Sequence, residues 1–570
     1  MRRFFHALLV ATLLVLPCPT LSVRSQQADG VQRKSDKPRK TDKSRKAVTS
    51  LAAQRGVQSI TSAQLKDYLT FIASDEMEGR DTPSRGLDTT AKFLAMSMSR
   101  FGLKPAGDTG SYFQKIALRR DIVDPEKTRV ALNDSPLTIG QDYIPTARPG
   151  SASGQLVYAG NGWFVKGKDI DAYRGIDARG KIAIIFSSLD GLPRGVSRSD
   201  LSGVRGEDWM GPTEYARKQG VAALVIVPDF QYLANWERNR QRLTERGSVS
   251  VEKFQTQSLS QLPVVVVSPR IANSLFAGEK QNGPTLFEAA YGDARPFPAF
   301  ELSSDKRMSI SIAGRNESLS TQNVVAVFEG SDPVLRNEYV ALGAHYDHVG
   351  MTNQTTGDAV YNGADDDGSG TTTLVAIAEA LSKAPTKPKR SVLFVWHAGE
   401  EKGLWGSRYF TEYPTVPLEQ IVAQINLDMI GRSKKAGDNS ARNRELSGAN
   451  EIYVIGSKMM STELGELSEA VNKGYLNLAY NYRYDDPHDP NRFFFRSDHY
   501  NYARKGIPII FFFDGEHEDY HRLGDSADKI DYQKMEQVAR TVYMTLWEVA
   551  NRATRPKVDK PLPQELIRIN

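Results

Sequence analysis

Apolar side chains recur at helical spacing in two places near the start of the ordered chain. In SAQLKDYLTFIASD, Leu65, Tyr68, Leu69 and Ile72 fall on one helical face. The segment TTAKFLAMSMSRF predicts a second helix that ends at Gly102, with a proline three residues beyond it. Each helix is amphipathic, so we expect one face of each to pack against a core.

The pattern changes after about residue 145. GKIAIIF, AALVIV and LPVVVVS read as buried strands, and TEYARKQG as a helix that ends at Gly220. These elements predict a compact α/β unit at 145–300, which contains no histidine. We expect this unit to shape or shield a cleft in the rest of the protein, or to bind partner or substrate segments, without supplying chemistry.

From about residue 305 to 552, apolar strands alternate with helical patterns. The strands are NVVAVF, EYVALGA, RSVLFVW, AQINLDM, EIYVIG and IPIIFFF, and the last helix carries an apolar stripe from Met535 to Val549. Such alternation predicts a doubly wound, mainly parallel sheet, hence an α/β fold. Sites on such sheets lie beyond the carboxyl ends of the strands.

The first residues have a different composition. Arg2 and Arg3 precede the ten apolar residues ALLVATLLVL, and this run is too short to span a bilayer. It predicts a signal peptide at 1–25 and an extracytoplasmic protein, periplasmic or secreted. Leu16-Pro17 before Cys18 is a poor lipoprotein cleavage box, so a released protein is favoured over a membrane-anchored one.

The cysteine content and the charge distribution restrict the possible metal ligands and binding partners. Cys18 is the only cysteine of the 570 residues and would leave with the signal peptide, so any metal must be held by His, Asp and Glu. The formal net charge is +5, but residues 1–50 hold eleven Lys/Arg and three Asp/Glu, which leaves −3 for the remainder. We therefore interpret 26–56 as a basic disordered linker and expect no nucleic-acid partner.

Candidate metal ligands follow several of the predicted strands. All seven histidines outside the signal peptide lie between residues 345 and 521. The residues at or just after strand ends are His345 with Asp347, His397 with Glu400 and Glu401, Asp428, and then His517 and His521. A His two residues before an Asp is typical of a metal ligand with its supporting carboxylate. Each position also has an ordinary structural interpretation when it is taken alone.

The stretch GADDDGSG sets Asp365, Asp366 and Asp367 against the start of a helix. One carboxylate there is explained by helix capping, but three adjacent ones repel each other unless a cation lies among them. Together with the strand-end residues they form a nitrogen and oxygen ligand set that suits zinc and is too large for one tetrahedral ion.

These motifs resemble those of the co-catalytic di-zinc aminopeptidases, whose relatives include glutamate carboxypeptidase, the transferrin receptor and glutaminyl cyclase. The resemblance covers about 57–552 and rests on GAHYDH, NGADDDGSG, AGEEKGLWGS, NLDMIG, RSDH and DYH. It implies a zinc exopeptidase fold with an inserted protease-associated α/β domain. The implied parts are a peptidase domain at 57–144 and 301–552, the insertion at 145–300, and a C-terminal tail at 553–570.

The resemblance also implies roles for individual residues and a cofactor of two zinc ions per chain. His345 and Asp428 would hold one ion, Glu401 and His521 the other, and Asp365 would bridge them. Glu400 would be the general base and Asp347 the partner of His345. A cis peptide bond after the bridging aspartate is a family feature, which predicts it at Asp365–Asp366.

The activity most common with this layout is removal of single amino-terminal residues from peptide substrates. One departure is Phe494, which stands where single-domain relatives carry an oxyanion-stabilising tyrosine, so either the metals or Arg496, Tyr500 or another group would take that role. The alternatives are a carboxypeptidase that uses Arg432, Arg483, Arg492 or Arg496, a non-catalytic receptor, a glutaminyl cyclase and a metal scavenger. The sequence predicts no oligomeric state.

Overall fold

A computed structural model describes residues 53–147, 149–188, 191–197, 200–201, 204–255, 262–292, 296–354, 356–563 and 566. The predicted signal peptide and nearly all of the predicted basic linker lie outside these residues. No helix in the described ranges is both long enough and apolar enough to cross a bilayer.

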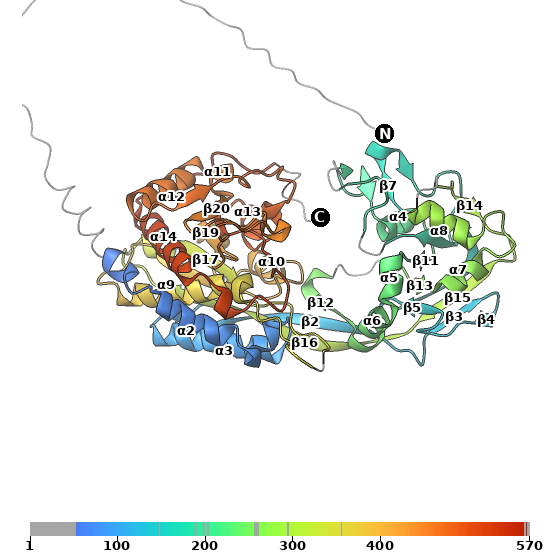
Figure 1. Ribbon diagram of the computed structural model, residues 1–570, viewed down its shortest axis with the longest axis horizontal. Coiled ribbons are helices and arrows are strands. Elements are labelled where there is room, and N and C mark those ends of the chain that lie inside the picture. Colours follow the sequence, from blue (N-terminus) through green and yellow to red (C-terminus); the bar gives the residue numbers. More distant parts are fainter. Residues whose placement is uncertain are drawn as a thin grey trace, which may run out of the picture. The chain divides into compact units, whose positions relative to one another are not determined.

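The larger sheet of the described chain has ten strands, in the order β12-β2-β16-β18-β17-β19-β22-β20-β21, with β1 beside β16 (Figure 1). Its centre is parallel, because β18, β17, β19 and β22 all run in one direction. The strands are β1 (Lys104–Pro105), β2 (Phe113–Val123), β12 (Ser248–Val251), β16 (Gly314–Phe328), β17 (Tyr339–His345), β18 (Ser391–His397), β19 (Ile421–Leu427), β20 (Glu451–Ile455), β21 (Ala479–Asn481) and β22 (Ile509–Phe513).

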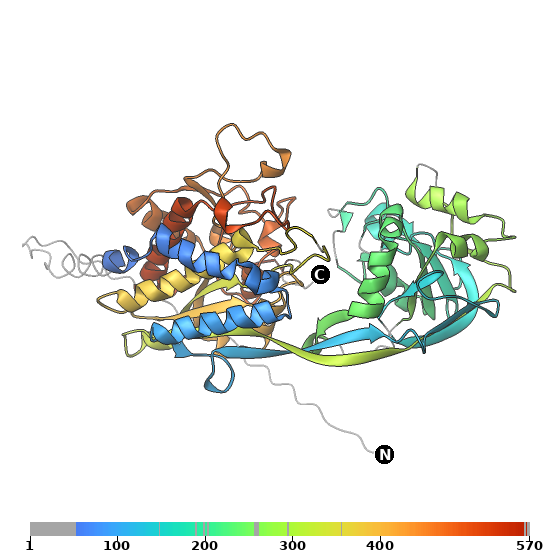
Figure 2. The same cartoon turned by 60° about the horizontal axis from the view of Figure 1, so that its bottom comes forward.

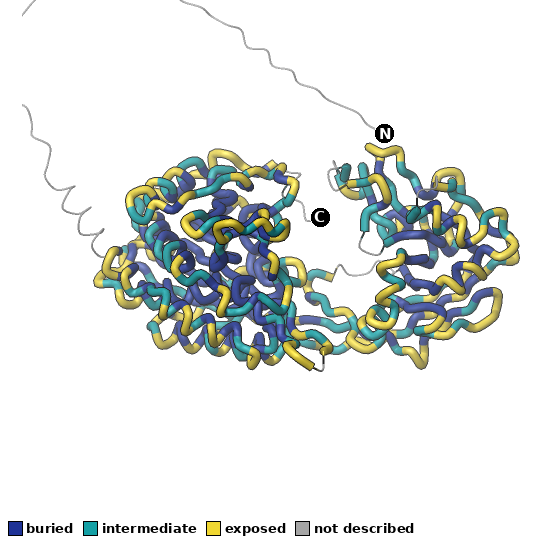
Figure 3. The backbone as a smooth tube through the Cα atoms, in the orientation of Figure 1, coloured by how far each residue is buried: buried dark blue, intermediate teal, exposed yellow. Residues whose placement is uncertain are grey.

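Helices cover both faces of this sheet, so its central strands are buried (Figure 3). One core combines strand residues with α2 (Ser62–Ile72), α3 (Arg85–Arg100), α9 (Gly370–Lys383) and α14 (Tyr532–Asn551). The other contains Phe410 from α10 (Trp405–Glu412), Tyr502 from α13 (His499–Ala503) and also Leu562 from the predicted tail. The predicted stripe on the last helix is confirmed, since Met535, Val538, Val542, Leu546 and Val549 are buried.

A second, nine-stranded sheet belongs mostly to the predicted insertion and has the order β4-β3-β15-β6-β9-β11-β13-β5, with β14 beside β6. Its parallel centre is made of β6 (Gly150–Tyr158), β9 (Ile182–Phe186), β11 (Ala223–Val227) and β13 (Val264–Val267). Its helices include α4 (Pro212–Lys218), α7 (Pro269–Leu275) and α8 (Gly283–Tyr291). The remaining strands are β3 (Arg129–Leu132), β4 (Ser135–Pro136), β5 (Tyr143–Pro145), β14 (Phe300–Glu301) and β15 (Arg307–Ile312). This sheet therefore contains residues from both sides of the predicted insertion at 145–300.

The two sheets are linked by β2 and β16, which pair antiparallel along their length (Figure 2). A further link comes from β12, which lies inside 145–300 in sequence but pairs with β2 in the larger sheet, with Ser248 opposite Asp121 and Val251 opposite Leu118. Phe254, just after β12, packs against Tyr409 of α10. The residues before β12 are thus fastened to the larger sheet.

Candidate metal centre

Three adjacent parallel strands deliver the central residues of the site. β17 ends at His345, β18 at His397, and β19 at Leu427, directly before Asp428. His345 lies in register with His397, and Glu400 and Glu401 follow on the loop after β18. Because the strands are parallel, their carboxyl ends meet at one edge of the sheet, as expected for a doubly wound fold.

One group of possible metal ligands contains His348, Asp366, Glu401 and His521, with a ligand atom of each within 4.8 Å of the others. The Nε2 atom of His521 lies 3.1 Å from Asp366 Oδ2 and 3.0 Å from Glu401 Oε2. The Nδ1 atom of His348 lies 3.0 Å from Glu401 Oε1. Glu401 and His521 thus share one group, as the resemblance implied, and His348 joins them.

A second group contains His345, Asp366 and Asp428. The Nε2 atom of His345 lies 3.2 Å from Asp366 Oδ1 and 3.5 Å from Asp428 Oδ1. Asp366 therefore belongs to both groups and turns one carboxylate oxygen toward each. A shared carboxylate of this kind is what a two-metal site requires.

The ligand atoms of the two groups are better satisfied by a bound cation than by contacts with one another. Asp366, Glu401 and Asp428 are buried or nearly so, and within the described chain they form ion pairs only with histidines, never with Lys or Arg. Asp366 Oδ2 and His521 Nε2 are buried without a hydrogen-bond partner. Burying several carboxylates costs several kcal/mol unless positive charge compensates them, and an all-nitrogen and oxygen set suits zinc.

The carboxylate that both groups share belongs to Asp366, whereas the resemblance implied Asp365. Asp365 Oδ1 accepts the Gly431 N–H at 2.7 Å, and Asp365 Oδ2 lies 3.3 Å from His517 Nε2, so this carboxylate joins neither group. The prediction of a cis bond at Asp365–Asp366 is also wrong, because the non-proline cis bond lies at Asp366–Asp367. The Asp525 carboxylate accepts the N–H groups of both Asp365 and Asp366 at 3.1 Å, which helps to hold the backbone of this turn.

The loop before GADDDGSG is held by a buried arginine. Arg80 is fully buried and donates to four backbone carbonyls, at Ile72, Tyr346, Asn362 and Gly363. A guanidinium carries five donors in a fixed fork, which suits such a set of carbonyls. Arg80 therefore connects the loop after β17 with the aspartate turn.

Asp347 lies beside His345, as the resemblance implied, and also contacts the segment of Glu400. Its carboxylate is 3.7 Å from His345 Nδ1, and its backbone carbonyl oxygen is 3.1 Å from that nitrogen. The Asp347 carboxylate also accepts the Glu400 N–H at 3.1 Å and the Thr82 hydroxyl at 3.1 Å. The carbonyl orients His345 with Nε2 toward the ligand group, and the carboxylate positions the Glu400 backbone.

Glu400 belongs to neither ligand group but lies beside the second one. Its Oε2 is 4.0 Å from His345 Nε2, and its side chain is only 11% exposed. Burial raises the pKa of the Glu400 carboxyl well above its usual range, and the neighbouring Glu401 and Asp428 carboxylates add to this effect. A carboxyl with a raised pKa is suited to accept and return a proton.

A small pocket opens directly onto this centre. On one side it is lined by His345, Asp366, Glu400 and Asp428, and on the other by Met429, Phe493, Phe511, Phe513, Tyr520, Arg496 and Glu516. Arg496 is paired with Glu516 at 2.6 Å, so the free part of the wall is mainly apolar.

Neither Tyr520 nor His348 receives a role from the sequence motifs. Phe494 is fully buried and does not line the small pocket, and the Tyr500 hydroxyl donates to the Leu566 carbonyl. Tyr520 lines the pocket, and its ring stacks on His521 at 4.0 Å between ring centres. Its signal in the sequence was its position directly before a candidate ligand in DYH.

The other histidines have structural surroundings. His499 is buried, its Nε2 lies 2.8 Å from the Phe494 carbonyl oxygen, and burial lowers its pKa to about 3, so it stays neutral. His517 faces Asp365, and His488 is exposed beside Asp486.

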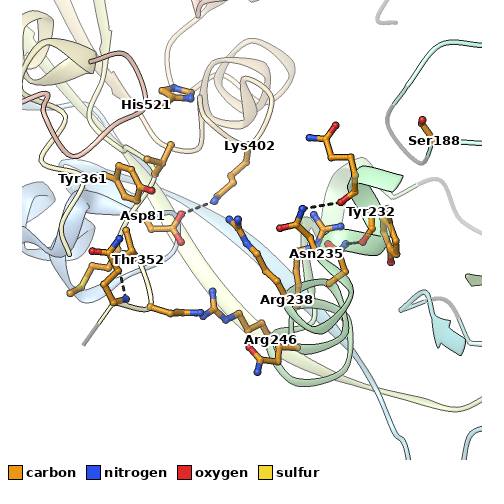
Figure 4. Close-up of a pocket in the computed structure, with 18 of the residues that line it drawn as sticks. Asp81, Ser188, Tyr232, Asn235, Arg238, Arg246, Thr352, Tyr361, Lys402 and His521 are labelled. Atoms are coloured by element: carbon orange, nitrogen blue, oxygen red, sulfur yellow. Dashed lines mark hydrogen bonds and ion pairs between the residues drawn. The ribbon is translucent and has the colours of Figure 1, made fainter. Parts of the chain in front are cut away.

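A larger cavity of about 1200 Å³ lies next to the first ligand group, with His521 in its wall (Figure 4). Residues of the larger sheet's loops, among them Asp81 and Lys402, line one side. Residues from 188–246, among them Tyr232 and Arg238, line the other.

Comparison with known proteins relates the segment that carries this site to a peptidase family. Residues 323–546, which carry every predicted ligand, match the model for peptidase family M28. The chain is 28% identical over 270 residues to a probable leucine aminopeptidase 2 of Aspergillus oryzae, which covers 46% of this chain and 48% of the relative. It is 26% identical over 330 residues to the aminopeptidase NAALADL1 of Mus musculus, covering 51% of this chain and 40% of the relative.

Among solved structures, an aminopeptidase from Aneurinibacillus sp. strain AM-1 shares the fold, with a TM-score of 0.50 and 16% identity. The alignment covers 90% of this chain and 97% of that one. The chain spans about half the length of the curated relatives that it matches.

Proposed function

We propose that the protein is a zinc-dependent exopeptidase that removes amino-terminal residues from peptides. The observation that carries this proposal is the carboxylate of Asp366, which is shared by two groups of ligands, with Glu400 free beside them and a pocket with apolar residues in its wall next to the second group. The M28 match over 323–546 supports the same reaction class.

Two zinc ions would be held in this arrangement. His348, Glu401 and His521 would hold one, His345 and Asp428 the other, and Asp366 would belong to both. Bound zinc supplies Lewis-acid chemistry, since it acidifies a water molecule and polarises the peptide carbonyl. The second group offers three protein ligands, which is the number typical of a catalytic zinc site with an open position.

Proton transfer, positioning of the base and binding of the terminal side chain would fall to residues of the chain. Glu400 would take the proton of the attacking water on its carboxylate and pass it to the departing amine. Asp347 holds the backbone of Glu400 in place. The pocket of Met429, Phe493, Phe511 and Phe513 would receive an apolar terminal side chain and exclude water from around it.

Tyr520 would stabilise the oxyanion in place of Phe494. At neutral pH a tyrosine hydroxyl is protonated and can donate a hydrogen bond. We expect Tyr520→Phe to lower kcat by about 10²- to 10³-fold, as the loss of one oxyanion donor typically does, with KM and zinc content little changed. Hydrolysis of a leucine anilide provides the measurement. Tyr500→Phe is the matched control, because its hydroxyl bonds to the Leu566 carbonyl. Equal kcat for wild type and Tyr520→Phe would remove Tyr520 from this role.

The charges around the pocket favour an aminopeptidase over a carboxypeptidase. A carboxypeptidase needs a free cation for the terminal carboxylate, but Arg496 is paired with Glu516. Arg432 is paired with Asp519, and Arg483 with Glu445. Arg492 lies over the ring of Phe495 and is not among the pocket residues.

Peptides with blocked ends test whether residues are removed from the amino or from the carboxyl end. We expect acetylation of the amino terminus to abolish trimming of a leucine-initiated pentapeptide, while amidation of the carboxyl terminus leaves stepwise loss of amino-terminal residues in place. Mass spectrometry of the products reads both outcomes. Loss of residues from the carboxyl end would show the carboxypeptidase, and cleavage of peptides blocked at both ends would show an endopeptidase.

Two further parts of the proposal concern location and domains. The signal-peptide pattern at 1–25 supports a protein that acts outside the cytoplasm. We infer that the smaller sheet and its helices form the protease-associated insertion, and that the insertion shapes the approach to the metal centre. Its residues line the large cavity together with His521, which supports this role.

A further inference from the structure

Three arginines line one wall of the large cavity at a spacing of four residues. Arg238 lies on α6 (Trp236–Gln241), and Arg242 and Arg246 begin and end the helical turn η5 (Arg242–Arg246) that continues it. All three are exposed and line the same cavity as His521 (Figure 4). We name Arg238, Arg242 and Arg246 the arginine row.

The arginine row has little negative charge to neutralise it. Within the described chain no ion pair joins Arg238 or Arg242 to a carboxylate, and Arg246 bonds to the amide oxygen of Asn353. Arg240, by contrast, is not among the cavity residues and is paired with both Glu237 and Glu245.

The carboxylates that line the cavity are already engaged. Asp81 pairs with Lys402 at 2.7 Å. Asp229 accepts the Tyr232 N–H at 2.8 Å and the Ser188 hydroxyl. The wall that carries the arginine row is therefore positively charged, although the protein after residue 50 is net negative.

The arginine row is anchored at both ends. Before it, Trp236 Nε1 donates to the Gly140 carbonyl at 2.6 Å. After it, Gly247, with a left-handed φ of 73°, leads straight into β12, which pairs with β2 of the larger sheet. The row is thus fastened to the sheet that carries the metal centre.

We propose that the arginine row binds carboxylates of the peptide substrate on the carboxyl side of the bond that is cut. This inference rests on the proposed function. With the terminal residue in the apolar pocket, the rest of the peptide leaves past His521, which borders both the ligand group and the large cavity. Guanidinium groups pair well with carboxylates, so acidic peptides with an apolar first residue are the favoured substrate class.

The test is competition between peptides of equal length in one reaction. The first is Leu-Ala-Glu-Glu-Ala amide, the second Leu-Ala-Gln-Gln-Ala amide, and the third the glutamine peptide with a free carboxyl terminus. We expect kcat/KM to favour the glutamate peptide by about tenfold at low salt, and the advantage to shrink at high salt because these charges are exposed. The third peptide separates side-chain carboxylates from the terminal carboxylate.

Variants of the arginine row test whether these residues cause the preference for the glutamate peptide. Replacing all three arginines by alanine is expected to bring the glutamate-to-glutamine ratio close to one, and the ratio is insensitive to any general loss of activity. Arg238→Glu with Arg242→Glu is expected to reverse the preference toward Leu-Ala-Lys-Lys-Ala amide. Arg217→Ala, on α4 and away from the cavity, is the control that keeps the wild-type ratio. An unchanged ratio in the triple variant overturns the inference.

Binding without turnover separates this inference from the proposed function. Fluorescence anisotropy of the glutamate and glutamine peptides, each with the dye attached through the carboxyl-terminal amide, is measured with Glu400→Gln protein. Salt-sensitive preference for the glutamate peptide, in a protein whose wild type hydrolyses none of them, would support the arginine row and reject the peptidase. Hydrolysis with equal use of charged and uncharged peptides would reject the row alone.

Discussion

Glu400→Gln is expected to lower kcat by about 10²- to 10⁴-fold, the usual contribution of a general base, while the zinc content of the protein stays unchanged. The glutamine amide has nearly the same shape but cannot accept the proton of the attacking water. Glu400 contributes no atom to either ligand group, so no metal ligand is lost.

Glu401→Gln is the matched comparison, because Glu401 is the next residue and belongs to the first ligand group. We expect this variant to lose zinc as well as activity. Zinc is measured by inductively coupled plasma mass spectrometry after dialysis, alongside hydrolysis of a leucine anilide. Zinc loss to the same extent in both variants would contradict the separate roles of the two glutamates.

Asp366→Asn is expected to remove most zinc from both positions and to abolish activity. Its two carboxylate oxygens face different groups, Oδ1 toward His345 and Oδ2 toward His521. An amide offers one oxygen and no charge, so neither group keeps its shared anionic ligand. The loss should also lower the thermal stability of the zinc-loaded protein, because a ligand that binds only the folded state stabilises it.

Asp365→Asn tests whether Asp366, and not its neighbour Asp365, is the shared ligand. The Asp365 carboxylate is buried with one oxygen on the Gly431 N–H and the other facing His517, and an amide supplies only one oxygen, so we expect a loss of stability of about 1–3 kcal/mol, the typical cost of a damaged buried hydrogen bond. Zinc content should remain close to wild type. If Asp365→Asn lost zinc and Asp366→Asn kept it, the assignment of Asp366 would be wrong.

Much of the site's location follows from the chain alone. His345, Glu400, Glu401 and Asp428 follow apolar runs that become the neighbouring parallel strands β17, β18 and β19. The carboxyl ends of parallel strands share an edge, so residues far apart in sequence converge without any knowledge of their contacts. The absence of cysteine after the predicted signal peptide also restricts the ligand atoms to nitrogen and oxygen.

Which of three adjacent aspartates bridges the groups could not be read from GADDDGSG. All three have the same chemistry, and their directions depend on the turn, whose backbone is held by Asp525 and Arg80 from distant segments. His348 likewise joins the first group only because its loop folds back over Glu401.

The sequence by itself determined the alternation of strands and helices, the face that each helix buries and the kinds of ligand available, since these depend on local periodicity and composition. Only the tertiary structure decided that Asp366 is shared, that Tyr520 enters the pocket and that the arginine row lines the same cavity as His521. The reason is physical, because side-chain direction at a turn and the approach of β12 to β2 are set by contacts between residues far apart in the chain.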